Sequence, residues 1–175
     1  MECVIRKWRT EDAKDLALAM NNKKIQDNLR DGLPYPYTQT DAEAFIAAML
    51  SEDNCRTYAF AITVDDRAVG SISVTRGENV HFRTAEMGYF IAEPYWGKGI
   101  GTSAVRQAAA YIFGQTDIIR IFADPYSDNA GSCRILEKAG FRLEGIMRKN
   151  AVKNQKVRDM KLYALLKEEA DESGF

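Results

Sequence analysis

The chain has 175 residues, of which 28% are charged and 46% are hydrophobic, and its formal net charge at pH 7 is −1. This length and composition predict one domain, residues 1–175, with a single core, and the balanced charge argues against disorder and against a surface for nucleic acid. No apolar stretch approaches the roughly 20 residues that span a bilayer, and the opening letters MECVIRKWRTED lack the apolar segment of a signal peptide, so we expect a cytoplasmic protein without a membrane partner.

The first predicted elements are a strand and a helix. The letters CVIRKW, residues 3–8, alternate as a half-buried strand does. Thr10 is then expected to cap a helix, because a threonine oxygen readily accepts a hydrogen bond from the amides of a first turn. The apolar face of this helix consists of Ala13, Leu16, Ala17 and Met20.

An irregular segment and a second helix follow. A glycine and two prolines interrupt residues 28–38, so this segment is expected outside regular structure, where it displays Tyr35 and Tyr37. Thr40 and Glu43 have the spacing of a capping box, which predicts a helix start. The apolar positions of that helix are Ala42, Phe45, Ile46, Met49 and Leu50.

The middle of the chain has the pattern of sheet followed by a helix. Residues 57–64 and 68–75 are apolar segments on either side of a polar turn, which predicts an antiparallel hairpin. Residues 83–93 supply a longer strand. An apolar stripe of helical period then covers residues 102–114 and predicts a buried helix.

The last third of the chain supplies a strand, a helix and a hairpin. Residues 118–124 predict a buried strand, residues 128–140 a helix, and residues 141–149 with 156–166 a closing hairpin. Only one strand, helix, strand crossover occurs, so this order predicts an α/β sheet of mixed direction and not a doubly wound one. Neighbouring strands can part at such a crossover, and we expect a ligand there.

Disulfide and metal sites are not expected. The chain has three cysteines, Cys3, Cys55 and Cys133, and one histidine, His81, all widely spaced. So few residues, so far apart, supply neither a disulfide framework nor a set of metal ligands.

Three glycines, Gly97, Gly99 and Gly101, stand at alternate positions between a predicted strand and a predicted helix. A glycine-rich turn before a helix leaves unpaired amide groups at the positive end of the helix dipole, which is a site for an anion, most often phosphate. Glycine suits this task because a side chain would hold the phosphate away from the backbone. Packing of the glycines under Trp96 is the alternative explanation, which needs no ligand.

Three phosphate ligands compete for such a turn: a mononucleotide, a dinucleotide and coenzyme A. A Walker loop is excluded, because Lys98 precedes Gly99 and no lysine stands before Thr102. The Rossmann pattern G-x-G-x-x-G also fails, since the chain has G-x-G-x-G set apart from Ile91 by further residues. Asp124 nevertheless ends the next strand, about where a ribose-binding acid belongs, so the dinucleotide alternative stays open.

These segments resemble the GNAT-superfamily N-acetyltransferases, in particular the RimJ/RimL-like branch. The letters AEMGYFIAEPYWGKGIGTSAV are similar to that branch's fourth strand, acyl-CoA loop and third helix, and DNAGSCRILEKAGF is similar to its second motif. LPYPYTQTDAEAFI resembles its early segment, and FRLEGIMRKNAVKNQKVRDMKLYALL its closing hairpin. The wider family begins the loop with Arg or Gln where this chain has Trp96, a difference that the branch shares.

The resemblance implies a GNAT fold of the α/β class: a mixed, mostly antiparallel sheet of about seven strands with helices on both faces. It also implies an enzyme that moves an acetyl group from acetyl-CoA to a primary amine by direct attack on the thioester. The amine would belong to a peptide N-terminus or a small molecule, and the protein would be a monomer or a homodimer. A module that binds acyl-CoA without turnover is the alternative from another class.

The resemblance also assigns cofactor contacts. Tyr89 and Ile91 match the edge positions that pair with the extended pantetheine arm, and the Ile91 amide is expected to stabilise negative charge on the thioester oxygen. Asn129 and Ser132 match contacts near the thiol end. The amides that would hold the pyrophosphate belong to Gly97, Lys98, Gly99, Ile100, Gly101 and Thr102.

The attacking amine needs a base, because an alkylammonium with a pKa of about 10.4 is protonated at neutral pH. Glu86 is the candidate base, and His81 is the second choice. Glu86 and Ile91 are an odd number of residues apart on one strand, so their side chains point to opposite faces, roughly 16 Å apart along the chain. A water relay is therefore expected between the base and the reacting amine.

A proton donor for the leaving thiolate is harder to assign. Much of the family places a tyrosine on the second-motif helix, and the matching residue here is Leu136. Ser132 and Tyr126 are the possible substitutes, although a thiol of pKa about 8.5 leaves tolerably well without an acid.

The residues that select the acceptor are expected in two loops. Residues 28–38 and the turn at residues 150–155 would flank the groove opposite the cofactor. In the first loop, Arg30 and Asp31 have the charge to meet a carboxylate or an amine.

Overall fold

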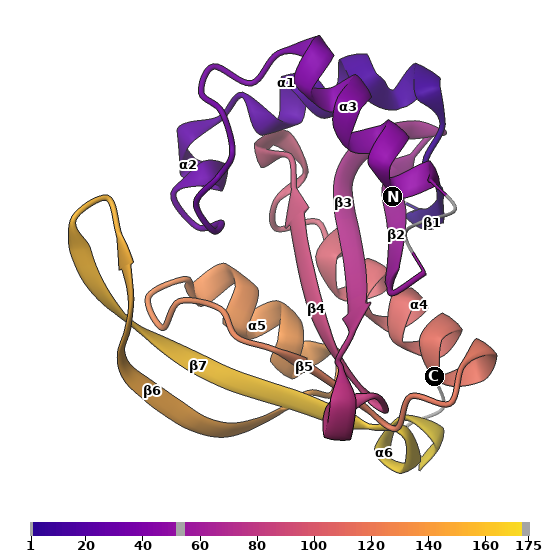
Figure 1. Ribbon diagram of the computed structural model, residues 1–175, viewed down its shortest axis with the longest axis vertical. Helices are drawn as coiled ribbons and strands as arrows, with labels where there is room; N and C mark the ends of the chain where they lie inside the picture. Colours follow the sequence, from indigo (N-terminus) through magenta and orange to yellow (C-terminus); the bar gives the residue numbers. More distant parts are fainter. Residues whose placement is uncertain (1, 52–54, 173–175) are drawn as a thin grey trace.

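The computed structural model describes residues 2–51 and 55–172. Within these residues the strands form one seven-stranded sheet of order β1-β2-β3-β4-β5-β7-β6 (Figure 1). Neighbouring strands are antiparallel except β4 and β5, which are parallel. The strands are β1 Val4–Lys7, β2 Thr57–Val64, β3 Arg67–Arg76, β4 Thr84–Ile91, β5 Arg120–Ala123, β6 Arg142–Lys153 and β7 Lys156–Leu166.

Helices lie on both faces of the sheet, which confirms the predicted fold class. Helices α1 and α3 cover one face and α4 covers the other (Figure 1). No helix among the described residues has the length and apolar character needed to cross a membrane. The helices are α1 Ala13–Met20, α2 Lys23–Gln26, α3 Gln39–Leu50, α4 Ile100–Gln115, α5 Ala130–Lys138 and α6 Lys167–Glu172, with single 3₁₀ turns η1 Thr10–Asp12, η2 Asn79–His81 and η3 Glu93–Tyr95.

The sheet separates two hydrophobic clusters, and β4 contributes to both. Met87 and Ile91 are buried in the larger cluster with the apolar stripe of α4. Phe90 packs against the smaller cluster, which includes Leu16 of α1 and Ile46 of α3. Because alternate strand residues point to opposite faces, β4 presents its even-numbered side chains to the α1 and α3 side.

Two predicted helix caps are wrong. Thr10 starts the 3₁₀ turn η1 without capping a helix. Thr38, and not Thr40, caps α3: its hydroxyl accepts from the Asp41 amide at 3.2 Å, and the Asp41 carboxylate accepts the Thr38 amide at 2.7 Å. Thr38 and Asp41 have the same three-residue spacing as Thr40 and Glu43, and the helix begins at the earlier pair.

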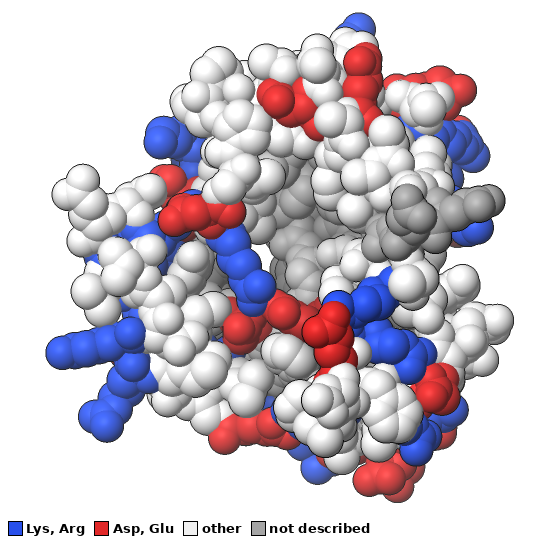
Figure 2. Space-filling model, in the orientation of Figure 1, with Lys and Arg blue, Asp and Glu red and all other residues white. Residues whose placement is uncertain are grey.

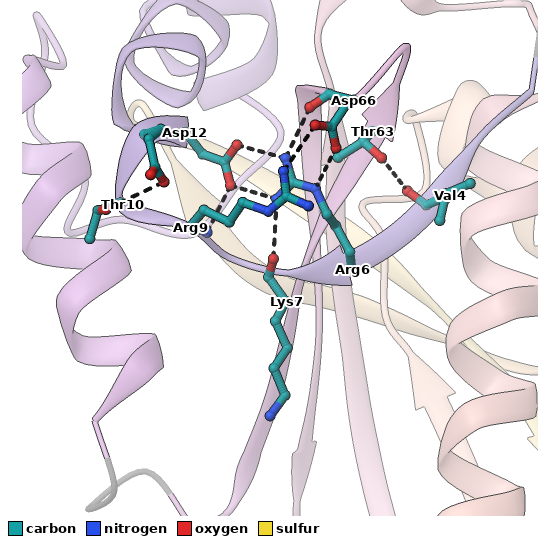
Figure 3. Close-up of polar contacts among 9 residues, drawn as sticks. Val4, Arg6, Lys7, Arg9, Thr10, Asp12, Thr63 and Asp66 are labelled. Carbon is teal, nitrogen blue, oxygen red and sulfur yellow. Dashed lines mark hydrogen bonds and ion pairs between the residues drawn. The ribbon is translucent and has the colours of Figure 1, made fainter.

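A charged cluster joins β1, η1 and the turn between β2 and β3 (Figure 3). The Arg6 guanidinium donates to both carboxylate oxygens of Asp12, at 2.8 and 2.9 Å, and to Asp66 at 3.2 Å. Asp12 also accepts the Arg9 amide at 2.9 Å. The Asp12 side chain is only 6% exposed and that of Arg6 15%, so this is a buried ion pair that anchors the N-terminal strand.

Candidate functional site

The central feature is a split between β4 and β5. The two strands pair only from Thr84 to Glu86, whereas β4 continues to Ile91 (Figure 1). Beyond Glu86 the edge of β4 that faces away from β3 therefore has no β5 partner. Among the described strands, β4 and β5 are the one parallel pair, and the sequence predicts a ligand at their crossover.

The polar groups on that edge belong to Tyr89 and Ile91. The Ala92 amide donates to the Val69 carbonyl at 2.7 Å, so residues of even number direct their backbone groups toward β3. Because peptide groups alternate along a strand, the amides of Tyr89 and Ile91 point into the split. The Ile91 carbonyl accepts the Trp96 indole N–H at 2.6 Å, a contact that fixes the end of β4 and that the sequence did not indicate.

A cavity of about 570 Å³ opens beside the split. Its walls include β3, β4, the loop after β5, the start of α5, helices α1 and α3, and the segment between α2 and α3. Figure 2 shows this face of the molecule hollowed where Figure 1 draws β3 and β4, with acidic and basic side chains around the hollow. Of the residues predicted from the sequence, the cavity brings together Glu86, Tyr89, Asn129 and Ser132.

Glu86 lies in this cavity with two charged partners from distant segments. Its carboxylate pairs with the Arg30 guanidinium, which also lies 3.4 Å from an oxygen of Asp124. Burial raises the pKa of Glu86; the positive charge of Arg30 opposes this effect, and the negative charge of Asp124 adds to it. Burial likewise raises the pKa of Asp124. Arg30 was expected to meet a charged group of the acceptor, but it pairs with two carboxylates of the protein itself. Asp124, the candidate ribose-binding acid, is one of these two carboxylates.

Glu86 and Ile91 remain on opposite faces of the sheet. The pairing of β4 with β3 runs without a register shift from Ala85 to Ile91, so no bulge turns one toward the other. Glu86 lines the cavity, whereas the Ile91 side chain is buried against the α4 side. His81 is exposed in η2 and falls outside the described cavity lining.

The three glycines before α4 have different structural roles. Gly97 and Gly99 have positive φ values of 72° and 80°, which favour glycine, and an added Cβ there would meet no described atom within 4 Å. At Gly101 a Cβ would lie 2.5 Å from the end of the Ile135 side chain, so this glycine allows α4 to pack against α5. The first α4 bond runs from the Ser103 amide to the Gly99 carbonyl, which leaves the preceding amides without a helical partner.

The other three loop residues, Lys98, Ile100 and Thr102, are also placed. Ile100 is buried, and Thr102 is half-buried in the first turn of α4. Lys98 is exposed, with its ammonium 5.4 Å from the centre of the Tyr95 ring. The loop from Gly97 to Thr102 lies outside the described lining of the cavity.

At the start of α5, Ser132 is held by two neighbours. The Asn129 side chain accepts the Ser132 amide at 3.2 Å, as an N-cap does, and the Ser132 hydroxyl lies 2.8 Å from the Tyr89 hydroxyl. Burial raises the pKa of Tyr89, so the Tyr89 hydroxyl keeps its proton near pH 7. Leu136 is fully buried. The Tyr126 hydroxyl donates to the Leu29 carbonyl at 3.4 Å.

The segment between α2 and α3 is tied to the β6–β7 hairpin. Lys153 pairs with Asp31 at 2.8 Å, and the Asn154 amide group donates to Asp27 at 2.9 Å. The two loops expected to surround the acceptor are therefore in contact. Tyr35 is exposed as predicted, but Tyr37 is buried and lines the cavity, because its ring joins the α1 and α3 cluster.

Comparisons with known proteins give a consistent family. Residues 3–142 match the model of the Acetyltransferase (GNAT) domain. The chain is 38% identical over 117 residues to the probable N-acetyltransferase YjcK of Bacillus subtilis, covering 67% of this chain and 65% of YjcK. It is 35% identical over 112 residues to the ribosomal-protein-serine acetyltransferase of Escherichia coli, covering 62% of each. The structure of Mycobacterium smegmatis RimJ in complex with CoA-disulfide superposes with a TM-score of 0.84 at 22% identity, over 98% of this chain and 89% of that one.

Proposed function

The chain belongs to the GNAT acetyltransferase family, and from this premise we propose that it transfers the acetyl group of acetyl-CoA to a primary amine. The acceptor is a peptide N-terminal α-amine or a small-molecule amine. The observation that carries the proposal is the free edge of β4 at Tyr89 and Ile91, which meets a cavity that contains the half-buried carboxylate of Glu86.

The residues present fit acetyl-CoA. The positive φ values and open surroundings of Gly97 and Gly99 leave the amides of the loop accessible to a diphosphate at the positive end of α4. The unpaired edge at Tyr89 and Ile91 suits an extended arm that carries amide groups, as an added strand would. When bound, acetyl-CoA supplies an acetyl group activated as a thioester.

The acetyl carbonyl needs a donor for the negative charge that develops on its oxygen. The Ile91 amide points into the split, and its direction is set by the pairing of β4 with β3 and by the Trp96 contact to the Ile91 carbonyl. A backbone donor of this kind needs no reorganisation during the reaction, which is the basis of its catalytic effect.

Glu86 is the proposed base. Its raised pKa brings a carboxylate closer to the range in which it can accept a proton from an ammonium group, and it lies in the cavity beside the split. Because its side chain and that of Ile91 are on opposite faces of β4, we propose that a water molecule passes the proton. The Ser132 hydroxyl, which is hydrogen-bonded to the Tyr89 hydroxyl, is the proposed proton donor for the leaving thiolate.

The test is release of free thiol from acetyl-CoA with a panel of peptides, polyamines and aminoglycosides. The wild-type protein is expected to turn over with at least one acceptor, and Glu86→Gln to lower kcat about 100-fold or more. Glu78→Gln is the matched control, because Glu78 also pairs with an arginine, Arg56, but lies outside the cavity lining described. Binding of acetyl-CoA without turnover of any acceptor would instead support the sensor module.

A further inference from the structure

Gly88, in the middle of β4, lacks the steric explanation that applies to Gly70 of the neighbouring strand β3. Its φ is not positive, and an added Cβ would meet no atom of the described residues within 4 Å. At Gly70 of β3, by contrast, a Cβ would lie 2.3 Å from the Phe90 carbonyl oxygen. A glycine weakens a strand interior, and Gly88, unlike Gly145 of β6, does not lie at a register shift of the sheet. Gly88 therefore points to another constraint at its position.

The space above Gly88 belongs to the cavity. Gly88 is exposed and lines the cavity between Glu86 and Phe90, its neighbours on the same face of β4. The residues opposite these three on β3 are small: Thr75 faces Glu86, Ser73 faces Gly88 and Ser71 faces Phe90. We call the surface formed by these six residues the acceptor trough. Its floor is low because its central pair, Gly88 and Ser73, carries so few side-chain atoms.

The two ends of the acceptor trough differ in chemistry. At one end, the carboxylates of Glu86 and Asp124 share the single guanidinium of Arg30, whose side chain is 69% exposed. If both carboxylates are ionised, these three groups carry one net negative charge. That end therefore suits an additional cation, such as the ammonium group of an acceptor.

At the other end the walls are apolar. Phe90 packs with the cluster that holds Leu16 and Met20 of α1 and Phe45 of α3, and all four residues line the cavity. The remaining acidic side chain of the described lining, Asp31, is already paired with Lys153 at 2.8 Å. A second cation on the acceptor would find no carboxylate at the apolar end, and burying it there would be unfavourable.

Resting on the proposed function, we propose that Gly88 is a specificity-determining residue for the acceptor. The amine of the acceptor lies on the Glu86 side of Gly88, where one water molecule joins it to the Glu86 carboxylate, and the group on the adjacent carbon lies over Gly88 toward Phe90. The preferred acceptors are then primary amines that carry an apolar group next to the amine, and not polyamines with a second charge.

The experiment uses amino-acid amides as acceptors, because they present one α-amine beside side chains of different size and polarity. With the wild-type protein and acetyl-CoA, kcat/KM is expected to be higher for leucinamide and phenylalaninamide than for glycinamide, and lowest for lysinamide. Gly88→Val is expected to raise KM for phenylalaninamide about tenfold or more while changing KM for glycinamide by less than about threefold.

Gly145→Val is the matched control. Gly145 lies in β6, has no described atom within 4 Å of an added Cβ, and is outside the described cavity lining. Its substitution is expected to leave the order of acceptors unchanged. Gly88→Ala provides a smaller step in the same direction if the valine variant folds poorly, although valine favours strands.

The outcomes separate the two proposals. If thiol is released but Gly88→Val changes KM equally for all amides, or for none, the role of Gly88 is refuted and the acetyltransferase function stands. A wild-type preference for lysinamide would equally refute the apolar specificity. If the wild-type protein releases no thiol with any acceptor, including the wider panel, the proposed function fails and the inference fails with it.

Discussion

Removal of the Asp12 carboxylate is expected to destabilise the protein, because it leaves the largely buried Arg6 guanidinium without its main partner. Asp12 accepts two hydrogen bonds from Arg6, at 2.8 and 2.9 Å, and one from the Arg9 amide at 2.9 Å. Removing one partner of a buried ion pair typically costs about 3–5 kcal/mol. Arg6 is 15% exposed and keeps Asp66 as a partner, so the lower end of this range, about 3 kcal/mol, is expected for Asp12→Ala.

Urea unfolding at pH 7 measures this loss directly. For a chain of this size, about 3 kcal/mol corresponds to a fall in melting temperature of roughly 6–12 °C. Asp66→Ala is the control: the Asp66 side chain is 69% exposed, so loss of its ion pairs is expected to cost much less stability than loss of the Asp12 carboxylate. Equal losses in the two variants would refute the argument that burial determines the strength of the Arg6 ion pairs.

The pH dependence provides an independent check. Burial raises the pKa of Asp12, but the hydrogen bonds from Arg6 and Arg9 outweigh it and hold the pKa below its ordinary value. A carboxyl with a lowered folded-state pKa contributes stability above its unfolded pKa of about 3.9, and this contribution is lost as the pH falls through the folded-state pKa. The stability difference between wild type and Asp12→Ala is therefore expected to shrink below about pH 4. A stability difference that grows as the pH falls would contradict a lowered pKa of Asp12 in the folded protein.

The remaining predictions concern α4, α3 and the cavity. Gly101→Val is expected to destabilise the protein by about 1–3 kcal/mol in urea unfolding through overpacking against Ile135, and adding Ile135→Ala is expected to recover part of the loss. Thr38→Ala is expected to cost about 1 kcal/mol through loss of the α3 cap, whereas Thr40→Ala stays within about 0.5 kcal/mol; the reverse order would restore the cap inferred from the sequence. Arg30→Ala removes a positive charge beside the proposed base, so the acid limb of the pH–rate profile is expected to move to higher pH; movement to lower pH would show that another group titrates.

Local sequence patterns predicted most of the elements of this fold. The turn between β2 and β3, the apolar stripe of α4 and the strand β4 are all visible in the pattern of residues close in the chain. The glycine loop and the second motif also identified the family, which the comparisons confirm. Where two local patterns compete, as in the caps at Thr38 and Thr40, neighbouring residues alone did not decide between them.

The sequence also placed the candidate base and the proposed cofactor contacts on one strand, with Glu86 and Ile91 on opposite faces. This was possible because the alternation of side chains along a strand is a local property. The spacing of Gly97 and Gly99 likewise predicted that they precede the start of a helix. The packing of Gly101 against Ile135 could not be predicted in this way, because Ile135 lies on another helix.

The surroundings of the site were decided only by the tertiary structure. Arg30 meets Glu86 and Asp124 because the segment between α2 and α3 folds over the end of the parallel strand pair. The Tyr89 hydroxyl meets Ser132 because α5 packs beside β4. Such contacts join residues that are distant in the chain, and they depend on sheet register and helix packing, which the local periodicity of a sequence does not contain.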